Sequence, residues 1–276
     1  MKFLIIFASI TFSALFANAH VPSANYIFKR LAENSGEKNY RIESEVELRS
    51  KEGSYRFTEV WNINNIYSMN VSFKGDLNGA IVYTKGQRQF VLGGKTQRQK
   101  YSEEFFELVF HNRSRETWSR FLEMTGIAKP SELFVEEVKL EKVREPGKKE
   151  LTLKTVYTPN SLVRPSRQLG ILNLAIGTPS EGGSSQLKPQ LWVDQEQFVI
   201  SKIRFRSGAE VEAKGYQVFA GKFQYPSLKT LRFEDGEASL KTTSVATFEK
   251  YEEPKDLSPI DTKDSHILNE YIKRFR

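Results

Sequence analysis

The feature that most constrains the fold of this chain is a two-residue period of apolar side chains. It is clearest between residues 40 and 48, where polar and charged residues alternate with Tyr40, Ile42, Val46 and Leu48. Successive side chains of a strand point to opposite faces of a sheet, so this period predicts one apolar and one charged face. Similar segments follow, separated mostly by glycine-containing turns, at residues 55–62, 66–74, 80–84 and 87–92. We therefore expect an antiparallel sheet whose strands pair in sequence order.

A second series of strand-like segments lies further along the chain, at residues 190–194, 198–206, 209–219, 228–234 and 238–250. Two more candidate strands lie between the two series, at residues 135–143 and 150–157. Helical patterns occur at residues 22–34, 102–110, 114–124, 166–176 and 264–276. Strands and helices do not alternate as βαβ units. The pattern predicts an α+β fold built on an antiparallel sheet of about 10 or 11 strands.

The first 19 residues have the composition of a secretory leader. Lys2 precedes an apolar run that ends at Phe16, and residues 17–19 (ANA) supply a small-x-small cleavage site before His20. The sequence contains no cysteine, which excludes a lipid anchor on cysteine, disulfides and thiolate metal sites. These features predict a periplasmic protein that is not lipid-anchored.

Positive charge is distributed unevenly along the chain. The formal net charge is +7, and residues 77–102 hold no acid but five bases, namely Lys85, Arg88, Lys95, Arg98 and Lys100. Such a segment could face anionic lipid head groups or an acidic partner. It could equally be a strand edge that its charges keep from pairing with other chains. Nucleic acid is a poor fit, because many carboxylates dilute the basic residues elsewhere.

A search for catalytic or metal-binding patterns gives negative results. The three histidines, His20, His111 and His266, do not have zinc-site spacing, and no G-x-S-x-G motif is present. The Gly-Lys-Thr triplet at residues 94–96 lacks the earlier glycine of a phosphate loop, because position 89 is Gln89. We expect no enzymatic activity, no metal and no cofactor.

Trp192 and Asp194 are the most suggestive pair of side chains in the second series of strands. No base or metal ligand accompanies them in the sequence. Asp194 begins the segment 194–197, and an aspartate at the first position of a turn accepts backbone hydrogen bonds. We expect a hairpin here rather than an active site.

The apolar faces of the strands have two equally good explanations. Aromatic residues make up 12% of the chain, and they can simply form the core. A curved sheet with few covering helices can also leave a cavity that suits acyl chains. The strand alternation assigns the following candidates to the lining of such a cavity: Ile42, Val46, Tyr67, Met69, Val71, Phe73, Ile203 and Phe205.

Two stretches of the sequence resemble a known family. A helix ending in RLAEN followed by YRIESEVELRSKEGSYRFTEVWNI, and the later LWVDQEQFVISKIRFRSGAEVEAKGYQVFAGKFQYPSLKTLRFEDG, are similar to the LolA/LolB-like outer-membrane lipoprotein-sorting proteins. The resemblance implies a half-open antiparallel β-barrel with helices covering its open face. It also implies an apolar concave surface that binds lipid acyl chains or lipoproteins in the periplasm. The chain departs from a simple carrier by additional residues at about 95–186 and by a final helix.

The expected organisation is a signal peptide at residues 1–19, a single half-barrel domain at 20–250, and a linker with an amphipathic helix at 251–276. A helical and loop insertion is expected at about residues 100–186. The first functional hypothesis is a periplasmic lipid or lipoprotein carrier that needs no covalent chemistry, with peripheral membrane contact. The alternative is an envelope structural or regulatory module. It would bind a protein partner through the basic segment and the final helix, whose apolar stripe is Ile267, Leu268, Tyr271, Ile272 and Phe275.

Overall fold

A computed structural model describes residues 22–129, 138–144, 151–157, 162–168, 171–177, 188–254 and 257–276. The expected leader at residues 1–19 lies outside these ranges, as does most of the glycine- and serine-rich segment 177–185. Among the described residues, no helix has both the length and the apolar character needed to cross a membrane.

The first half of the described chain forms a meander of six strands. They are β1 (Asn39–Ser50), β2 (Gly53–Asn65), β3 (Ser68–Gly75), β4 (Gly79–Thr84), β5 (Gln87–Leu92) and β6 (Lys95–Lys100). Each strand pairs antiparallel with the next one in sequence. The prediction of a sheet that pairs in sequence order is confirmed for this half.

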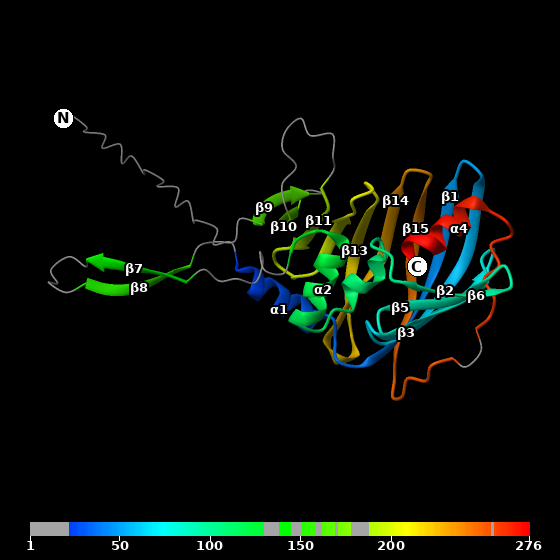
Figure 1. Cartoon of the computed structure of the whole chain (residues 1–276), viewed down its shortest axis with the longest axis horizontal. Helices are drawn as coiled ribbons and strands as arrows, with labels where there is room; N and C mark the ends of the chain where they lie inside the picture. Colours follow the sequence, from blue (N-terminus) through cyan, green and yellow to red (C-terminus); the bar gives the residue numbers. More distant parts are fainter. Residues whose placement is uncertain are drawn as a thin grey trace, which may run out of the picture.

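The second half forms another meander in the same sheet. Its strands are β9 (Val163–Gln168), β10 (Ile171–Ile176), β11 (Gln190–Asp194), β12 (Ile200–Arg204), β13 (Glu210–Phe219), β14 (Phe223–Phe233) and β15 (Gly236–Phe248). The two meanders join where β1 pairs antiparallel with β15, for example Val46 with Leu240. The result is one open sheet of 13 strands in the order β6-β5-β4-β3-β2-β1-β15-β14-β13-β12-β11-β10-β9 (Figure 1). The expected α+β class with a large open antiparallel sheet is confirmed.

A separate hairpin is formed by β7 (Val138–Arg144) and β8 (Leu151–Tyr157). These two strands make their own two-stranded sheet, and in Figure 1 they lie apart from the main sheet. They correspond to the strands expected at residues 135–143 and 150–157.

The helix expected at residues 166–176 is wrong, because this segment forms β9 and β10. Leu174 pairs with Val193 of β11 on one side and with Pro165 of β9 on the other. Pro165 has no N–H to give to a neighbour, and within the described residues β9 is the last strand of the sheet order, where a proline is tolerated. An apolar run as short as ILNLAI does not distinguish strand from helix by its period.

The helices are α1 (Ala24–Asn34), α2 (Arg115–Thr125), α4 (His266–Phe275) and the short 3-10 helices η1 (Phe106–Phe110) and η2 (Ala220–Lys222). Ser114 caps the start of α2 in a capping box, and Gly126 ends it with a φ of 66°. The helix expected at residues 102–110 is only partly right. A turn in which the Phe105 N–H donates to the Ser102 carbonyl comes first, and η1 follows.

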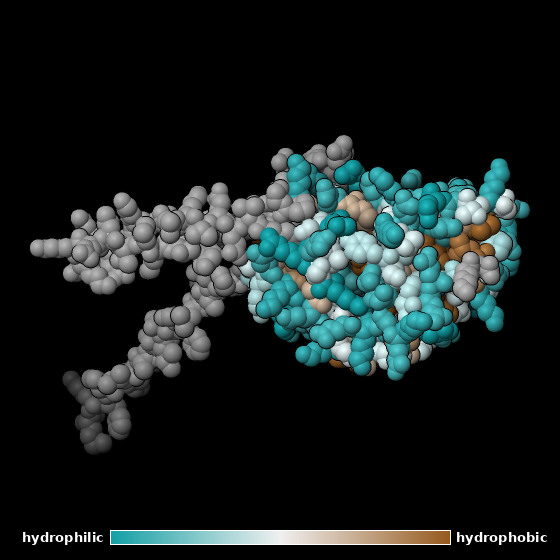
Figure 2. Space-filling model, turned by 60° about the horizontal axis from the view of Figure 1, so that its bottom comes forward, coloured by the Kyte–Doolittle hydropathy of each residue, from teal (hydrophilic) through white to brown (hydrophobic). Residues whose placement is uncertain are grey.

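Helices α1, α2, α4 and η1 cover one face of the main sheet (Figure 1). Along β1 and β2 the buried residues alternate with less buried ones, so that Val46 faces Phe57 and Ile42 faces Trp61 across the strand pair. These inner positions pack against η1 and α4 in a single hydrophobic core. The surface seen in Figure 2 is mostly hydrophilic, with hydrophobic residues visible only in places. Among the described residues, Tyr26 and Val218 are the large hydrophobic side chains that are exposed.

The hairpin expected at Trp192 and Asp194 is confirmed. Oδ1 of Asp194 accepts hydrogen bonds from the N–H groups of Glu196 at 2.9 Å and Gln197 at 2.7 Å. The chain then continues into β12, with Phe198 in the left-handed region at a φ of 53°. Asp194 therefore builds a turn, as its position in the sequence predicts.

Candidate functional site

The eight residues that alternation assigned to a cavity lining all belong to the hydrophobic core or pack against it. Seven are buried in the core, namely Ile42, Val46, Met69, Val71, Phe73, Ile203 and Phe205. Tyr67 is only partly buried and packs at the margin of this core. The strand alternation predicted that these residues lie on one side of the sheet. In the structure, other side chains of the same protein cover most of them.

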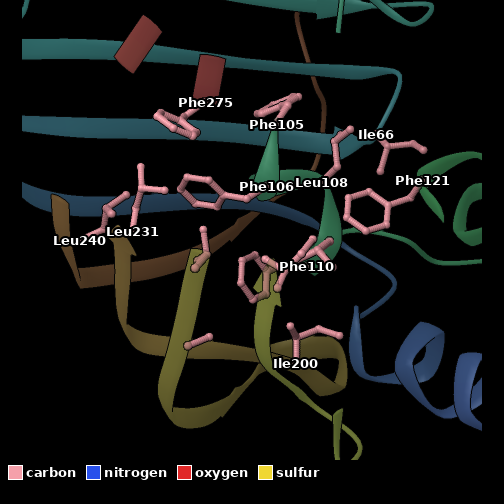
Figure 3. Close-up of a cluster of buried hydrophobic side chains, with 14 of the residues drawn as sticks. Ile66, Phe105, Phe106, Leu108, Phe110, Phe121, Ile200, Leu231, Leu240 and Phe275 are labelled. Carbon is pink, nitrogen blue, oxygen red and sulfur yellow. The ribbon is translucent and has the colours of Figure 1, made fainter. Parts of the chain in front are cut away.

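The covering side chains come mainly from the segment around η1 and from α4. Phe105 stacks on Tyr83 with ring centroids 4.6 Å apart, and Tyr271 of α4 meets Phe57 of β2 at 5.6 Å. Figure 3 shows Phe105, Phe106 and Phe110 lying between strand residues such as Leu231 and Leu240 and residues such as Ile66 and Phe121. Much of the sheet's inner face is therefore occupied by protein.

A first cluster of charges is buried within this core. Nζ of Lys229 lies 2.7 Å from Oε2 of Glu107, and both side chains are almost completely buried. His111 Nε2 lies 3.2 Å from Oε1 of the same carboxylate, and the Tyr225 hydroxyl donates to it. Burial alone would raise the pKa of Glu107, but the Lys229 charge and the His111 hydrogen bond outweigh it and lower this pKa. The cluster holds an ionised carboxylate that no solvent reaches.

A second buried cluster joins α4 to the sheet. The Arg276 guanidinium donates to both carboxylate oxygens of Glu59, at 2.7 and 2.9 Å, and both side chains are fully buried. Tyr271 and Trp61 also donate to this carboxylate, at 2.8 and 3.2 Å. Burial opposes the charge of Arg276, yet the Glu59 carboxylate raises the pKa of the guanidinium. Neither cluster is open to a substrate, so both are structural.

An open pocket of about 350 Å³ lies where the β3–β6 side of the sheet meets α2. We call it the edge pocket. Its apolar and aromatic walls come from Ile66, Tyr67, Tyr101, Leu108, Phe121 and Met124. The remaining lining residues are Lys85, Gly86, Gln87, Lys100, Asn112 and Arg120. Its volume falls within the range of roughly 300–1,000 Å³ that is typical of small-molecule sites.

Local structure fixes the walls of the edge pocket. Arg120, Phe121 and Met124 lie at i, i+1 and i+4 of α2, which places them on one side of the helix. Lys85 and Gly86 form the two-residue turn between β4 and β5, with φ angles of 49° and 80°. Positive φ at both positions is typical of the tight hairpin turn that matches strand twist. The Lys85 N–H donates to the Tyr67 carbonyl at 3.1 Å, which holds this turn beside the start of β3.

Polar groups in the wall are partly unpaired. The Tyr101 hydroxyl donates to the Ile66 carbonyl at 2.8 Å, and burial raises the pKa of Tyr101. Nδ2 of Asn112 donates to the Leu108 carbonyl at 3.0 Å. By contrast, Oδ1 of Asn112 and the Tyr67 hydroxyl are buried and have no hydrogen-bond partner among the described residues. Unpaired buried polar atoms are uncommon in folded proteins.

Two other pockets differ in chemistry. One of about 590 Å³ lies between α1 and α2, and its lining mixes acids such as Glu33 with bases such as Arg113. The other, of about 410 Å³, includes Phe205 beside Glu103, Glu104 and Arg206. Both are dominated by polar residues of mixed charge. Of these three pockets, the edge pocket has the most apolar and aromatic lining residues, six of its twelve, and its charged lining residues are all cations.

Sequence analysis found part of this site. Tyr67 was among the expected lining residues, and Lys85 and Lys100 belong to the basic segment at residues 77–102. Arg88, from the same segment, is buried and donates to the carbonyls of Ile272 and Lys273 at 3.0 and 2.8 Å, so it holds α4 instead. The pocket residues on α2 were not predicted, because no local sequence pattern shows that this helix packs beside the β3–β6 side of the sheet. Across the described part of the chain, no group of three or more His, Cys, Asp or Glu residues could hold a metal ion.

Comparison with known proteins gives similarity at the level of solved structures. No protein-family model matches the sequence, and no curated protein matches it. A putative outer-membrane lipoprotein-sorting protein domain from Vibrio parahaemolyticus is similar with a TM-score of 0.48 and 10% identity, over 84% of this chain and 94% of that one. A LolA superfamily protein from Nitrosomonas europaea has a TM-score of 0.46 and 11% identity, over 83% and 96% of the two chains.

A third structure, a DUF1329 family protein from Desulfovibrio piger, has a TM-score of 0.46 and 8% identity, over 81% of this chain and 91% of that one. Two of the three similar structures are thus described in the same terms as the family that the sequence resembles.

Proposed function

We propose that this protein is a periplasmic lipid-binding carrier that holds an acyl chain of a lipid or lipoprotein in the edge pocket. The observation that carries the proposal is the lining of that pocket, where six apolar or aromatic side chains border an open volume of about 350 Å³. Burying a methylene group of an acyl chain against such a wall contributes about 0.8 kcal/mol. A short run of methylenes would therefore give useful affinity.

The proposed function needs no covalent chemistry. The residues that line the edge pocket include no carboxylate, histidine or thiol, which are the groups that general acid–base and nucleophilic catalysis use most often. Release of the lipid would follow from a higher affinity of an acceptor for the same acyl chain. The leader expected at residues 1–19 supports a periplasmic location for this carrier.

The test is uptake of a fluorescent fatty acid by the purified protein, together with native mass spectrometry of protein isolated from the periplasmic fraction. Met124 lines the pocket and Glu123, one residue earlier on α2, is exposed and does not. Met124→Trp should fill the pocket and weaken uptake by roughly tenfold. Glu123→Trp adds the same ring outside the pocket and should leave uptake unchanged. Wild-type protein that is always empty and takes up no fatty acid would overturn the proposal.

The alternative, an envelope module that binds a protein partner, was based on the basic segment and the final helix. The apolar stripe of α4 is buried in the core of this chain, so it offers a partner no free surface. The exposed, basic strand β6 remains as a feature that favours the alternative. Specific capture of one protein by wild-type chain, lost when Lys95 and Arg98 are replaced by Gln, would support it over the carrier function.

A further inference from the structure

Three cations line the edge pocket, and they come from three separate elements. Lys85 lies in the β4–β5 turn, Lys100 ends β6, and Arg120 lies on α2. The twelve lining residues include no acid. The site therefore combines an apolar wall with positive charge of a single sign, which is the pattern that an amphiphile with a negative end would match.

The positive charge is only partly neutralised by neighbouring side chains. Arg120 pairs with Glu116 at 2.7 Å, but both side chains are well exposed, and such a pair contributes little in water. Lys85 and Lys100 have no ion pair among the residues that the structure describes. Low-dielectric walls concentrate the field of such charges inside a cleft.

One cation is oriented by the wall of the pocket. The Arg120 guanidinium lies over the ring of Tyr67, 5.4 Å from its centroid, a contact that holds the charge beside the apolar surface. The buried hydroxyl of Tyr67 and Oδ1 of Asn112 are the two wall atoms that have no partner among the described residues. Of the two, only the Tyr67 hydroxyl can donate to an anionic head group, because Oδ1 of Asn112 is an acceptor.

We propose that the edge pocket selects acyl amphiphiles with an anionic head group, such as a long-chain carboxylate. The chain lies against Phe121, Met124 and their apolar neighbours, and the head group lies among Lys85, Lys100 and Arg120. This inference rests on the proposed function, because it assumes that an acyl chain enters the same pocket. It adds that the charge of the lipid decides its affinity.

The test compares palmitate with its methyl ester, which has the same chain and no charge, in competition with a fluorescent fatty alcohol. Wild-type protein should bind palmitate roughly tenfold more tightly than the ester, the change expected for two or three partly exposed charge contacts. Added salt should reduce this preference, because it screens exposed charges. Inorganic phosphate, which has charge but no chain, should not compete at millimolar concentration.

A double variant and a matched control locate the effect. Lys85→Gln with Lys100→Gln should remove the preference for palmitate and leave ester binding unchanged, which also shows that the variant is folded. Lys95→Gln with Arg98→Gln changes the net charge equally, on the exposed strand β6 but outside the lining, and should keep the preference.

Equal binding of palmitate and ester by wild-type protein would overturn the inference and leave the proposed carrier function intact. Equal loss in the two double variants would also overturn it, because general charge rather than the pocket would then attract the anion. If palmitate, its ester and the alcohol all fail to bind, the proposed function itself fails.

Discussion

At the scale of single residues, the unusual feature of this protein is charge placed inside an apolar core. Glu107 with Lys229 and Glu59 with Arg276 are buried side by side with aromatic rings. Burying an isolated charge costs many kcal/mol, and the pairs persist because every carboxylate has several donors. Such pairs restrict how the core can be arranged, since a shifted strand would leave a charge without its partner.

Sequence alone could not find these pairs. Lys229 is one of two bases in β14, and Glu107 ends the polar and aromatic segment SEEFFE at residues 102–107. Exposed lysines and glutamates are far more common than buried ones. Only the position of η1 against β14 shows that the two side chains meet, and that position depends on contacts between segments more than a hundred residues apart.

His111 should make the protein less stable in mild acid. Burial lowers the pKa of His111 below its usual value of 6.5, outweighing the nearby Glu107 carboxylate, while Arg113 and Lys229 act in the same direction as burial. A folded-state pKa below the unfolded value gives stability that is present above pH 6.5 and is lost as the pH falls towards the folded-state pKa. The free energy of unfolding should therefore fall between pH 7 and pH 5, by at most about 1.4 kcal/mol per pH unit.

Urea denaturation at pH 7, 6 and 5 measures this slope. His111→Gln should flatten it, whatever the variant's stability at pH 7. His266→Gln is the control, because that side chain is exposed and should leave the slope as in the wild type. A slope that is the same with and without His111 would contradict the assignment.

At the scale of secondary-structure elements, the spacing of apolar residues correctly predicted which face of a strand or helix is buried. Strand alternation placed the inner face of β1 to β3, and the apolar stripe of α4 is buried as a helix with that spacing should be. The spacing of such a stripe does not show which surface the helix packs against. The final helix was expected to be available to a partner, whereas it covers the sheet of its own chain.

Helix α4 should therefore be essential for stability. Arg276→Ala leaves Glu59 buried without its cation, which should cost about 3–5 kcal/mol of unfolding free energy. Lys273→Ala on the exposed side of the same helix should change the free energy of unfolding very little. Chemical denaturation followed by Trp61 fluorescence, whose ring lies beside this cluster, measures both.

A double variant separates lost charge pairing from lost packing. Glu59→Gln with Arg276→Met removes both charges and keeps most of the volume, so it should be less destabilised than Arg276→Ala alone. If the double variant is the less stable of the two, the ion pair is not what holds α4 in place.

At the scale of the whole molecule, the two meanders share one core and one continuous sheet. The pairing of β1 with β15 runs through the full length of both strands. Because the core cluster includes residues of both halves, neither half buries its inner face alone. The class of fold followed from the alternation in the sequence, but this central pairing did not, since nothing in a strand's period identifies a distant neighbour.

The two halves should unfold together. Trp61 lies in β2 and Trp192 in β11, so variants that retain one of them, with the other and Trp118 replaced by Phe, report on one half each. In each variant, the fluorescence midpoint in urea should coincide with the midpoint of its own far-UV circular dichroism. Separate midpoints in either variant would show that the halves are independent cooperative units.

The pairing of β1 with β15 also governs when folding can finish. As the chain is synthesised, β1 emerges among the first described residues, but Leu240, the partner of Val46, follows 194 residues after it. Until the ribosome has released that stretch, β1 keeps an unpaired edge and the core stays incomplete. Contacts so distant in sequence make folding slow. A nascent chain in which β15 has not yet been made therefore exposes an unpaired strand edge, which can pair with the strands of other chains.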